Sequence, residues 1–287
     1  MNAGPFTPLP RLNLARAFGE EPPPIDYILP GLVAGTVGCL MSPGATGKSW
    51  LALEVATAVA GGPDILDLGI NRYGRVMLIA AEDPELILRH RMHALGERLS
   101  KHNIETVIEN LDVPLALAQG VNLRNQQWID QLAHEGEGCR LIIIDTLSRV
   151  HDGDENDRKD AAPIMRSLEI LAAHTGAAIL FLHHISKGMA LAGQGDQQQA
   201  ARGSSVWVDE SRWAGFLRGM DATEGKALGV GEEMRRHFVR FGVNKCNYGA
   251  PFLDIWLRKE TAGLLTRAVL EKSRRPKAKK GVGDDTW

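Results

Sequence analysis

The chain contains the stretch Gly38-Cys-Leu-Met-Ser42-Pro-Gly44-Ala-Thr-Gly47-Lys48-Ser49-Trp50-Leu-Ala-Leu53, in which an apolar strand turns through a glycine-rich loop into an apolar-faced helix. Such a loop is typical of phosphate binding, because glycines let backbone N–H groups close round a triphosphate, Lys48 can reach the outer phosphates and Ser49 can bind Mg²⁺. Ser42 stands where the usual pattern has its first glycine, and we expect Gly44 to replace it. A glycine turn with an incidental Gly-Lys-Ser is the alternative. The predicted nucleotide contacts are Gly44, Ala45, Thr46, Gly47, Lys48, Ser49 and Trp50.

A second apolar strand is predicted over Arg75–Ala81, and it leads into Glu82-Asp83-Pro84. Asp83 followed by Pro84 suits the N-cap and first turn of a helix over Glu85–Leu99. That role leaves Glu82 unexplained. A carboxylate at the carboxyl end of a buried strand, beside a phosphate loop, can orient and deprotonate an attacking water. Glu82 is therefore our candidate for the catalytic base, and a solvated strand end is the alternative.

Two later apolar strands also end in polar side chains. The run Arg140–Ile144 leads into Asp145, whose carboxylate we expect to hold the Mg²⁺ together with Ser49. The strand Ala177–Leu182 leads into His183 and His184. Adjacent strand residues point to opposite faces, which disfavours a metal held by both histidines. From the residues alone, a solvated pair of histidines is an equally good interpretation.

Length and composition fit one large α/β domain with short appendages, since the 287 residues are 44% hydrophobic and 24% charged. The net charge of −2 provides no overall basic field, so any nucleic-acid contact must be a local surface. Three scattered cysteines, Cys39, Cys139 and Cys246, favour small core residues in a reducing cytosol. The first residues lack the basic start and apolar run of an export signal, so we expect none, and no apolar run predicts a membrane span. We expect a cytoplasmic protein without a membrane partner.

The remaining segments are predicted more coarsely. A short helix is predicted at Leu12–Phe18, and because so short a helix is marginal alone, it needs a docking surface on its own core or on a neighbouring subunit. The connector Ile25–Leu32 could place apolar side chains beside the nucleotide base. Further predictions are a polar loop over His151–Asp160, a helix over Ala162–His174, a glycine- and glutamine-rich loop over Gly188–Ser205, strands near Arg212–Leu217, Arg236–Gly242 and Phe252–Leu257, a helical stretch near Thr223–Met234, and a basic tail from Lys272.

The order of these features resembles the RecA-like ATPases, which include ring-shaped replicative helicases. The closer resemblance is to the RepA-type hexameric helicases of mobilisable plasmids, and it covers roughly residues 12–270. It rests on the segments Ala81-Glu82-Asp83-Pro84, Arg91-Met-His93-Ala-Leu-Gly96, Phe181-Leu-His-His184, Gly195-Asp-Gln-Gln-Gln199, Arg202-Gly-Ser-Ser205, Val239-Arg-Phe-Gly242, Lys245 and Asn247-Tyr-Gly-Ala-Pro-Phe252.

This resemblance implies an α/β fold: a RecA-like P-loop core with a mainly parallel central sheet, helices on both faces and a C-terminal antiparallel extension. Three segments are then expected, namely an N-terminal arm and linker (1–33), the ATPase domain (34–270) and a basic tail (271–287). The resemblance also implies a homohexameric ring that hydrolyses ATP, with Mg²⁺, to move along single-stranded DNA. Because no primase or zinc domain is evident, plasmid initiator and primase proteins are expected partners.

Several residue roles come from the resemblance alone. His184 would sense the γ-phosphate beside Lys48 and Glu82, and an arginine of the next subunit would act in trans. Arg212 is our first candidate for that arginine, with Lys245 in support and Arg202 in reserve, because the family's late Lys-x-Arg pair reads Lys245-Cys246-Asn247 here. The residues expected to face DNA are Lys187, Gln197, Gln198 and Gln199. A RecA-like regulatory or signalling ATPase that unwinds nothing is the alternative function.

Overall fold

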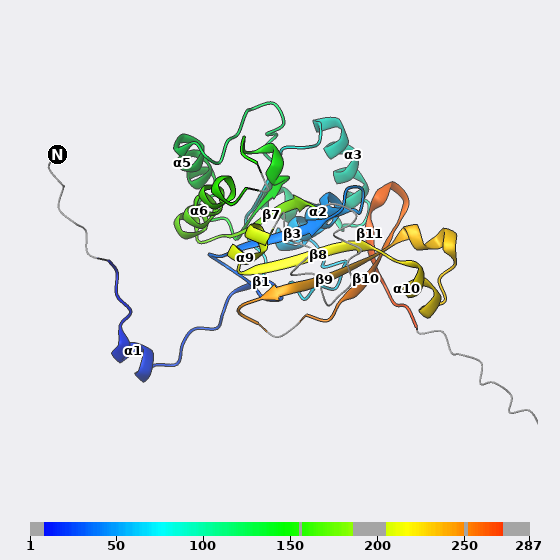
Figure 1. Cartoon of the computed structure of the whole chain (residues 1–287), viewed down its shortest axis with the longest axis horizontal. Coiled ribbons are helices and arrows are strands. Elements are labelled where there is room, and N and C mark those ends of the chain that lie inside the picture. The colour runs from blue at the N-terminus through cyan, green and yellow to red at the C-terminus, as the bar shows by residue number, and fades with distance from the viewer. Residues whose placement is uncertain (1–8, 155–156, 186–204, 250–251, 272–287) are drawn as a thin grey trace, which may run out of the picture.

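The central feature of the computed structural model, which describes residues 9–154, 157–185, 205–249 and 252–271, is a nine-stranded sheet with the order β11-β10-β9-β8-β3-β7-β6-β4-β5 (Figure 1). Its strands are β3 (Val37–Ser42), β4 (Val76–Ala80), β5 (Leu111–Asp112), β6 (Leu141–Asp145), β7 (Ala178–His184), β8 (Trp213–Gly219), β9 (Phe238–Cys246), β10 (Ile255–Lys259) and β11 (Leu265–Ala268). A separate two-stranded ribbon pairs β1 (Tyr27–Leu29) with β2 (Leu32–Val33).

Strand direction divides the sheet into two parts. The strands β3 to β8 pair in parallel with one another, whereas β9, β10 and β11 follow in antiparallel register. Because the central parallel strands are buried on both faces, they are continuous apolar runs, as in β4 and β6, whereas the edge strand β5 is not buried. The predicted α/β fold with a C-terminal antiparallel extension is thus confirmed.

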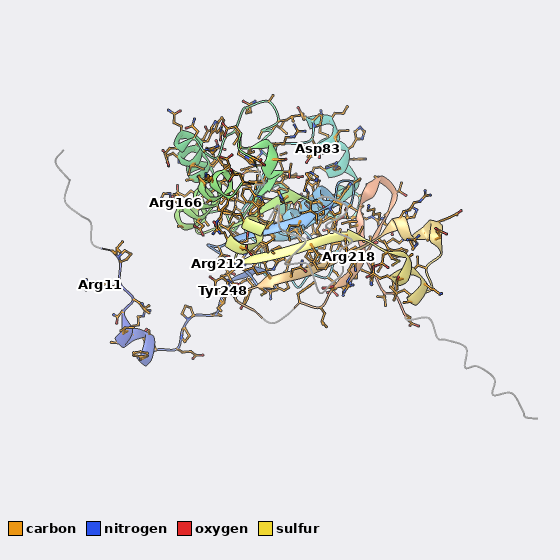
Figure 2. All side chains as sticks on the ribbon, in the orientation of Figure 1. Arg11, Asp83, Arg166, Arg212, Arg218 and Tyr248 are labelled. Atoms are coloured by element: carbon orange, nitrogen blue, oxygen red, sulfur yellow. The ribbon has the colours of Figure 1, made fainter. Side chains whose placement is uncertain are left out.

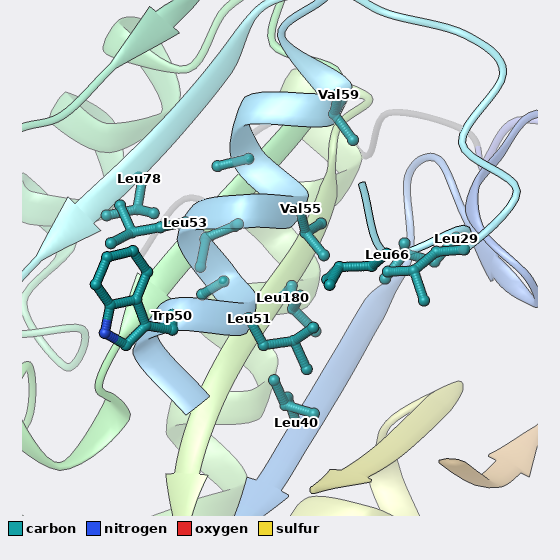
Figure 3. Close-up of a cluster of buried hydrophobic side chains, with 14 of the residues drawn as sticks. Leu29, Leu40, Trp50, Leu51, Leu53, Val55, Val59, Leu66, Leu78 and Leu180 are labelled. Atoms are coloured by element: carbon teal, nitrogen blue, oxygen red, sulfur yellow. The ribbon is translucent and has the colours of Figure 1, made fainter. Parts of the chain in front are cut away.

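Helices lie on both faces of this sheet. The helices of the described chain are α1 (Leu14–Gly19), which stands apart from the sheet, α2 (Lys48–Val59), α3 (Glu85–Gly96), α4 (Lys101–Asn110), α5 (Gln126–Glu135), α6 (Arg158–Thr175), α9 (Ser205–Glu210) and α10 (Ala222–Ala227), with short 3₁₀ turns η1 (Leu147–Arg149), η2 (Glu232–His237) and η3 (Thr261–Gly263). One apolar core lies under α2, where its side chains meet those of the central strands (Figure 3). The other lies between the opposite sheet face and the helices α5 and α6. These two apolar cores bury both faces of the central sheet and so fix the positions of its strand ends. The polar side chains at those strand ends are held in place as a result.

Several predicted boundaries move in the structure. The helix predicted to reach Leu99 ends at Gly96. The predicted polar loop over His151–Asp160 ends early, because the Asp157 side chain caps α6 by accepting a hydrogen bond from the Lys159 N–H. The helical stretch near Thr223–Met234 divides into α10 and η2. The sequence-based predictions did not include α4, α5, β5 or β11.

The helix α1 is not docked on the chain's own core. None of its residues is buried, and Leu14 and Phe18 are 57% and 87% exposed. Figure 1 shows it standing apart from the sheet and its covering helices. In the connector after it, Ile28, Leu29 and Leu32 are buried in the α2 core and do not line the phosphate-loop cavity. Placement of connector side chains beside a nucleotide base stays a prediction.

Candidate functional site

The phosphate loop connects the end of β3 to the start of α2. Ser42 is the last residue of β3 and is fully buried, so a side chain fits where the usual pattern has glycine. The left-handed backbone conformations fall on Ala45, with φ of 62°, and on Gly47, with φ of 108°. Gly44 has no positive φ, so it does not supply the conformational freedom that we expected of it. The Thr46 hydroxyl donates to the Pro43 carbonyl at 2.7 Å and closes the turn.

A cavity of about 290 Å³ opens at this loop. Among the residues named from the sequence, it is lined by Ala45, Thr46, Gly47, Lys48, Ser49, Trp50, Glu82 and His184. Lys48 is 4% exposed, so its ammonium is held in a largely water-free position at the start of α2. Positive charge and a helix N-terminus both favour an anion here.

Asp145 lies behind the cavity at the end of β6. Burial raises the pKa of its carboxyl group, while a hydrogen bond from Ser49 and the charge of Lys48 act in the opposite direction. Its Oδ1 atom is buried and has no hydrogen-bond partner within the described chain. A carboxylate oxygen left unpaired beside a serine hydroxyl suits the oxygen ligands and water shell of Mg²⁺. Ser49 and Asp145 therefore fit the predicted magnesium site.

Glu82 and His184 meet across the cavity from two different strand ends. The Nε2 atom of His184 lies 3.5 Å from Oε2 of Glu82, and the side chains are 39% and 35% exposed. His184 also pairs with Ser42 at the carboxyl end of β3. The structure thus brings Glu82, the predicted base, and His184, the predicted sensor, together beside the phosphate loop, and the chemical roles of these two residues stay predictions. His183, which precedes His184 in the chain, is buried and packs against Trp207.

Asp83 does not cap the following helix. The N-cap of α3 is Pro84, and no side chain bonds the free N–H groups there. Instead the Asp83 carboxylate accepts hydrogen bonds from both terminal nitrogens of Arg91, and the Arg91 guanidinium lies 5.8 Å from the centre of the Trp50 ring. The ion pair outcompetes the local cap because two charge-assisted hydrogen bonds are stronger than one bond to a backbone N–H. It also holds a cation at the cavity lining.

Arg212 and Lys245 lie at the other end of the sheet from this chain's phosphate loop. The Arg212 N–H donates to the carbonyl of Val37, the first residue of β3, whereas the loop follows the last residue. Lys245 lies close enough for the charge of Arg212 to affect its pKa, which burial lowers, and its Nζ donates to the carbonyls of Val208 and Asp209. Figure 2 shows Arg212 far from Asp83, which lines the cavity.

The predicted DNA-facing residues Lys187, Gln197, Gln198 and Gln199, together with Arg202, lie outside the described residues. The basic tail from Lys272 does so as well. Within the described chain, no helix is both long enough and apolar enough to cross a membrane.

Five lining residues were not assigned to the cavity from the sequence. These are Pro43, Asp83, Arg91, Lys259 and Gly263. Arg91 could have been suspected, since it falls in a segment that supports the family resemblance. Lys259 and Gly263 reach the cavity only because β10 and β11 fold back beside α2, and no local pattern indicates that.

Comparison with known proteins gives one family and one fold. Three solved structures each match over 82% of this chain: an ATPase domain (TM-score 0.54, 15% identity, 86% of that chain), the RadB recombinase (0.50, 13%, 90%) and a DnaB-like replicative helicase described with its interactions with primase (0.53, 16%, 58%). These similarities show the fold of RecA-like P-loop ATPases. The profile of the AAA domain family matches residues 5–190, which is more than half of the chain, and the chain therefore belongs to that family.

Proposed function

We propose that this chain is the ATP-dependent replicative DNA helicase of a plasmid, of the RepA type, working as a hexameric ring on single-stranded DNA. The observation that carries the proposal is the meeting of Lys48, Ser49, Glu82 and His184 in one cavity at the carboxyl ends of parallel strands. Such strand ends are where α/β sheets bind ligands. His184 is also the last residue of β7, which leads toward the segment that the family resemblance assigns to DNA.

Each side chain in the cavity has a separate task in hydrolysis. Lys48 neutralises charge on the outer phosphates. Ser49 and Asp145 would hold Mg²⁺, which would supply further charge neutralisation. Glu82 accepts a proton from the attacking water. His184, 3.5 Å from Glu82, registers whether the γ-phosphate is present. Shifts of this histidine would then move the chain that follows β7.

A ring accounts for the position of Arg212. In a head-to-tail ring each subunit presents one surface to the opposite surface of the next. Arg212 lies far from its own phosphate loop, is exposed, and has Lys245 beside it. We propose that Arg212 completes the nucleotide site of the neighbouring subunit, where it neutralises transition-state charge, with Lys245 in support and Arg202 as the reserve candidate. In this proposal the division into arm, ATPase domain and tail follows the boundaries 1–33, 34–270 and 271–287.

The proposal is tested by measuring mass and ATP hydrolysis together, each with and without single-stranded DNA. We expect a hexamer with ATP, and hydrolysis that DNA accelerates. A hexamer whose ATPase rate ignores DNA, and which unwinds no forked duplex, would favour the regulatory or signalling ATPase instead. A chain that neither binds nor hydrolyses ATP would overturn both functions.

The DNA contact is tested separately with Lys187→Ala. We expect this variant to keep DNA-free hydrolysis, to lose DNA stimulation and unwinding, and to show a weaker dependence of DNA affinity on salt, because a phosphate contact is removed. The matched control is Lys101→Ala, which removes the same charge from a side chain that is 92% exposed on α4. If both variants bind DNA like the parent, the segment after β7 is not the DNA contact.

A further inference from the structure

The hairpin formed by β10 and β11 belongs to the nucleotide site although it lies near the end of the described chain. The Leu265 N–H donates to Oε1 of Glu54 on α2 at 2.6 Å. A side chain on Gly263 would come within 2.5 Å of the Trp50 indole nitrogen, so the η3 turn lies directly against the start of α2. These two contacts fix the position of the residue at the end of β10, Lys259.

Lys259 points at the phosphate loop. Its Nζ donates a hydrogen bond of 2.9 Å to the carbonyl oxygen of Ala45, across 214 positions of sequence. Its stem also lies near Gly47, since a Cβ there would be 3.7 Å from the Lys259 Cε atom. The half-buried side chain lines the 290 Å³ cavity together with Lys48.

The ammonium of Lys259 forms no ion pair with an acidic side chain of the described residues, and burial alone lowers its pKa. The following carboxylate, Glu260, accepts instead from the Thr266 hydroxyl at 3.1 Å and pairs with Arg258. A lysine has three N–H donors and Ala45 accepts one, so two remain for a ligand. An anion in the cavity would relieve the cost of this unmatched charge.

The Ala45 carbonyl belongs to the same peptide group as the Thr46 N–H. A cation on the carbonyl oxygen polarises that group and makes its N–H a stronger donor. Holding the carbonyl toward Lys259 also fixes the peptide plane at a residue with a left-handed backbone. The Thr46 N–H, which lies in the same plane and points opposite to the carbonyl, is then held in a fixed direction for a phosphate oxygen.

We propose that Lys259 is a second phosphate-binding lysine of this site, which orients the Ala45–Thr46 peptide and adds a positive charge to the phosphate cavity from the same chain. The inference rests on the proposed nucleotide-binding function, and it adds a residue to the site that the phosphate-loop motif does not contain. Its ligand is the polyphosphate part of the nucleotide and not the base.

The test compares binding of ATP, ADP and inorganic tripolyphosphate to the full chain by calorimetry at several salt concentrations. Lys259→Met removes the charge while keeping the length of the side chain, and Lys259→Arg keeps the charge. Arg258→Met is the matched control, because it removes one positive charge from the adjacent position, where the side chain is 50% exposed and lies outside the cavity lining. Lys259→Gln is a second neutral variant in case the Met variant does not fold.

We expect the neutral Lys259 variants to bind all three ligands about tenfold more weakly, as when a charge-assisted hydrogen bond is lost. Their affinity should also depend less steeply on salt, while Lys259→Arg and Arg258→Met stay near the parent. Loss of ATP affinity without loss of tripolyphosphate affinity would overturn the proposal, because it would place Lys259 at the base or sugar. So would an equal loss in Lys259→Arg, or an unchanged salt dependence. If the parent itself binds none of the ligands, the proposed function fails, and this inference, which rests on it, fails with it.

Discussion

Glu54 is a buried carboxyl group in the middle of α2, and the fold opposes its ionisation. Its side chain is 2% exposed. One oxygen accepts the hydrogen bond from Leu265, while Oε2 is buried without a hydrogen-bond partner in the described chain. Burial raises the pKa of Glu54 from 4.5 to about 8, although the Leu265 N–H acts against this, and no charged side chain among the described residues contributes.

The effect of pH on the free energy of unfolding follows from comparing the protonation of Glu54 in the folded and in the unfolded chain. Below about pH 4.5 the carboxyl is protonated in both the folded and the unfolded chain, so its contribution to stability is fully present. Between pH 4.5 and about 8 only the unfolded chain releases the proton, and stability falls as the pH rises. At about 1.36 kcal/mol for each pH unit, the free energy of unfolding decreases by about 5 kcal/mol over this range. That is a large part of the 5–15 kcal/mol typical of a folded domain.

The substitution Glu54→Gln should remove this dependence. Glutamine keeps an oxygen that can accept from the Leu265 N–H, and it cannot ionise. We expect the unfolding free energy of the variant to exceed that of the parent by an amount that grows with pH up to about pH 8. Urea unfolding followed by circular dichroism at a series of pH values measures the difference, in which all other titrating groups cancel. Glu109→Gln, an exposed glutamate on α4, is the control and should follow the parent.

Parallel pH curves for Glu54→Gln and the parent would refute this reasoning. They would mean that Glu54 is ionised in the folded chain, or that the contact between α2 and β11 does not exclude water. A Gln variant that is less stable at every pH would point to lost packing instead.

Three further predictions concern the chemistry of the site. Lys48→Ala should lower ATP hydrolysis by at least about 10²-fold in a steady-state assay, because backbone donors cannot replace the charge; full activity would contradict the assignment of the phosphate loop. Glu82→Gln should bind ATP normally but turn it over about 10²–10⁴-fold more slowly; equal losses of binding and turnover would point to a structural role. Arg212→Ala should cost about 10³–10⁵ in rate, and its mixture with Glu82→Gln should regain some hydrolysis. If native mass spectrometry shows mixed rings and ATP hydrolysis does not recover, Arg212 does not act on the site of the neighbouring subunit.

The phosphate loop could be predicted from sequence because its determinants are local. The strand β3, the turn at Gly47 and the start of α2 follow one another in the chain, and each has a short-range signature. The places of Glu82 and Asp145 were predictable for a related reason, whereas His184 was assigned to the site only through the family resemblance. Parallel strands carry their carboxyl ends to one edge of the sheet, so residues that follow apolar runs are brought together by topology.

The failures come where tertiary contacts compete with local rules. Asp83 has the sequence context of a helix cap, yet the guanidinium of Arg91 offers it a stronger, charged partner. The start of α6 was predicted too late because the acidic residues before it are typical of a polar loop, although one of them, Asp157, is a good N-cap. Helix α5 could have been found, because Asn125 caps it and Ile129 and Leu132 form a buried face. Nothing local predicts Lys259.

The strand order has a consequence for how the protein is made. The phosphate-loop strand β3 is among the first strands to be synthesised, but its neighbours in the sheet are β7, which begins at Ala178, and β8, which begins at Trp213. While the ribosome is still producing the intervening chain, both edges of β3 lack their partners. Pairing over such sequence distances is slow, and an apolar strand with open edges is exposed to aggregation and to chaperones in the meantime. The phosphate loop is therefore synthesised early, but the sheet that holds it in place is complete only after β7 and β8 have been synthesised.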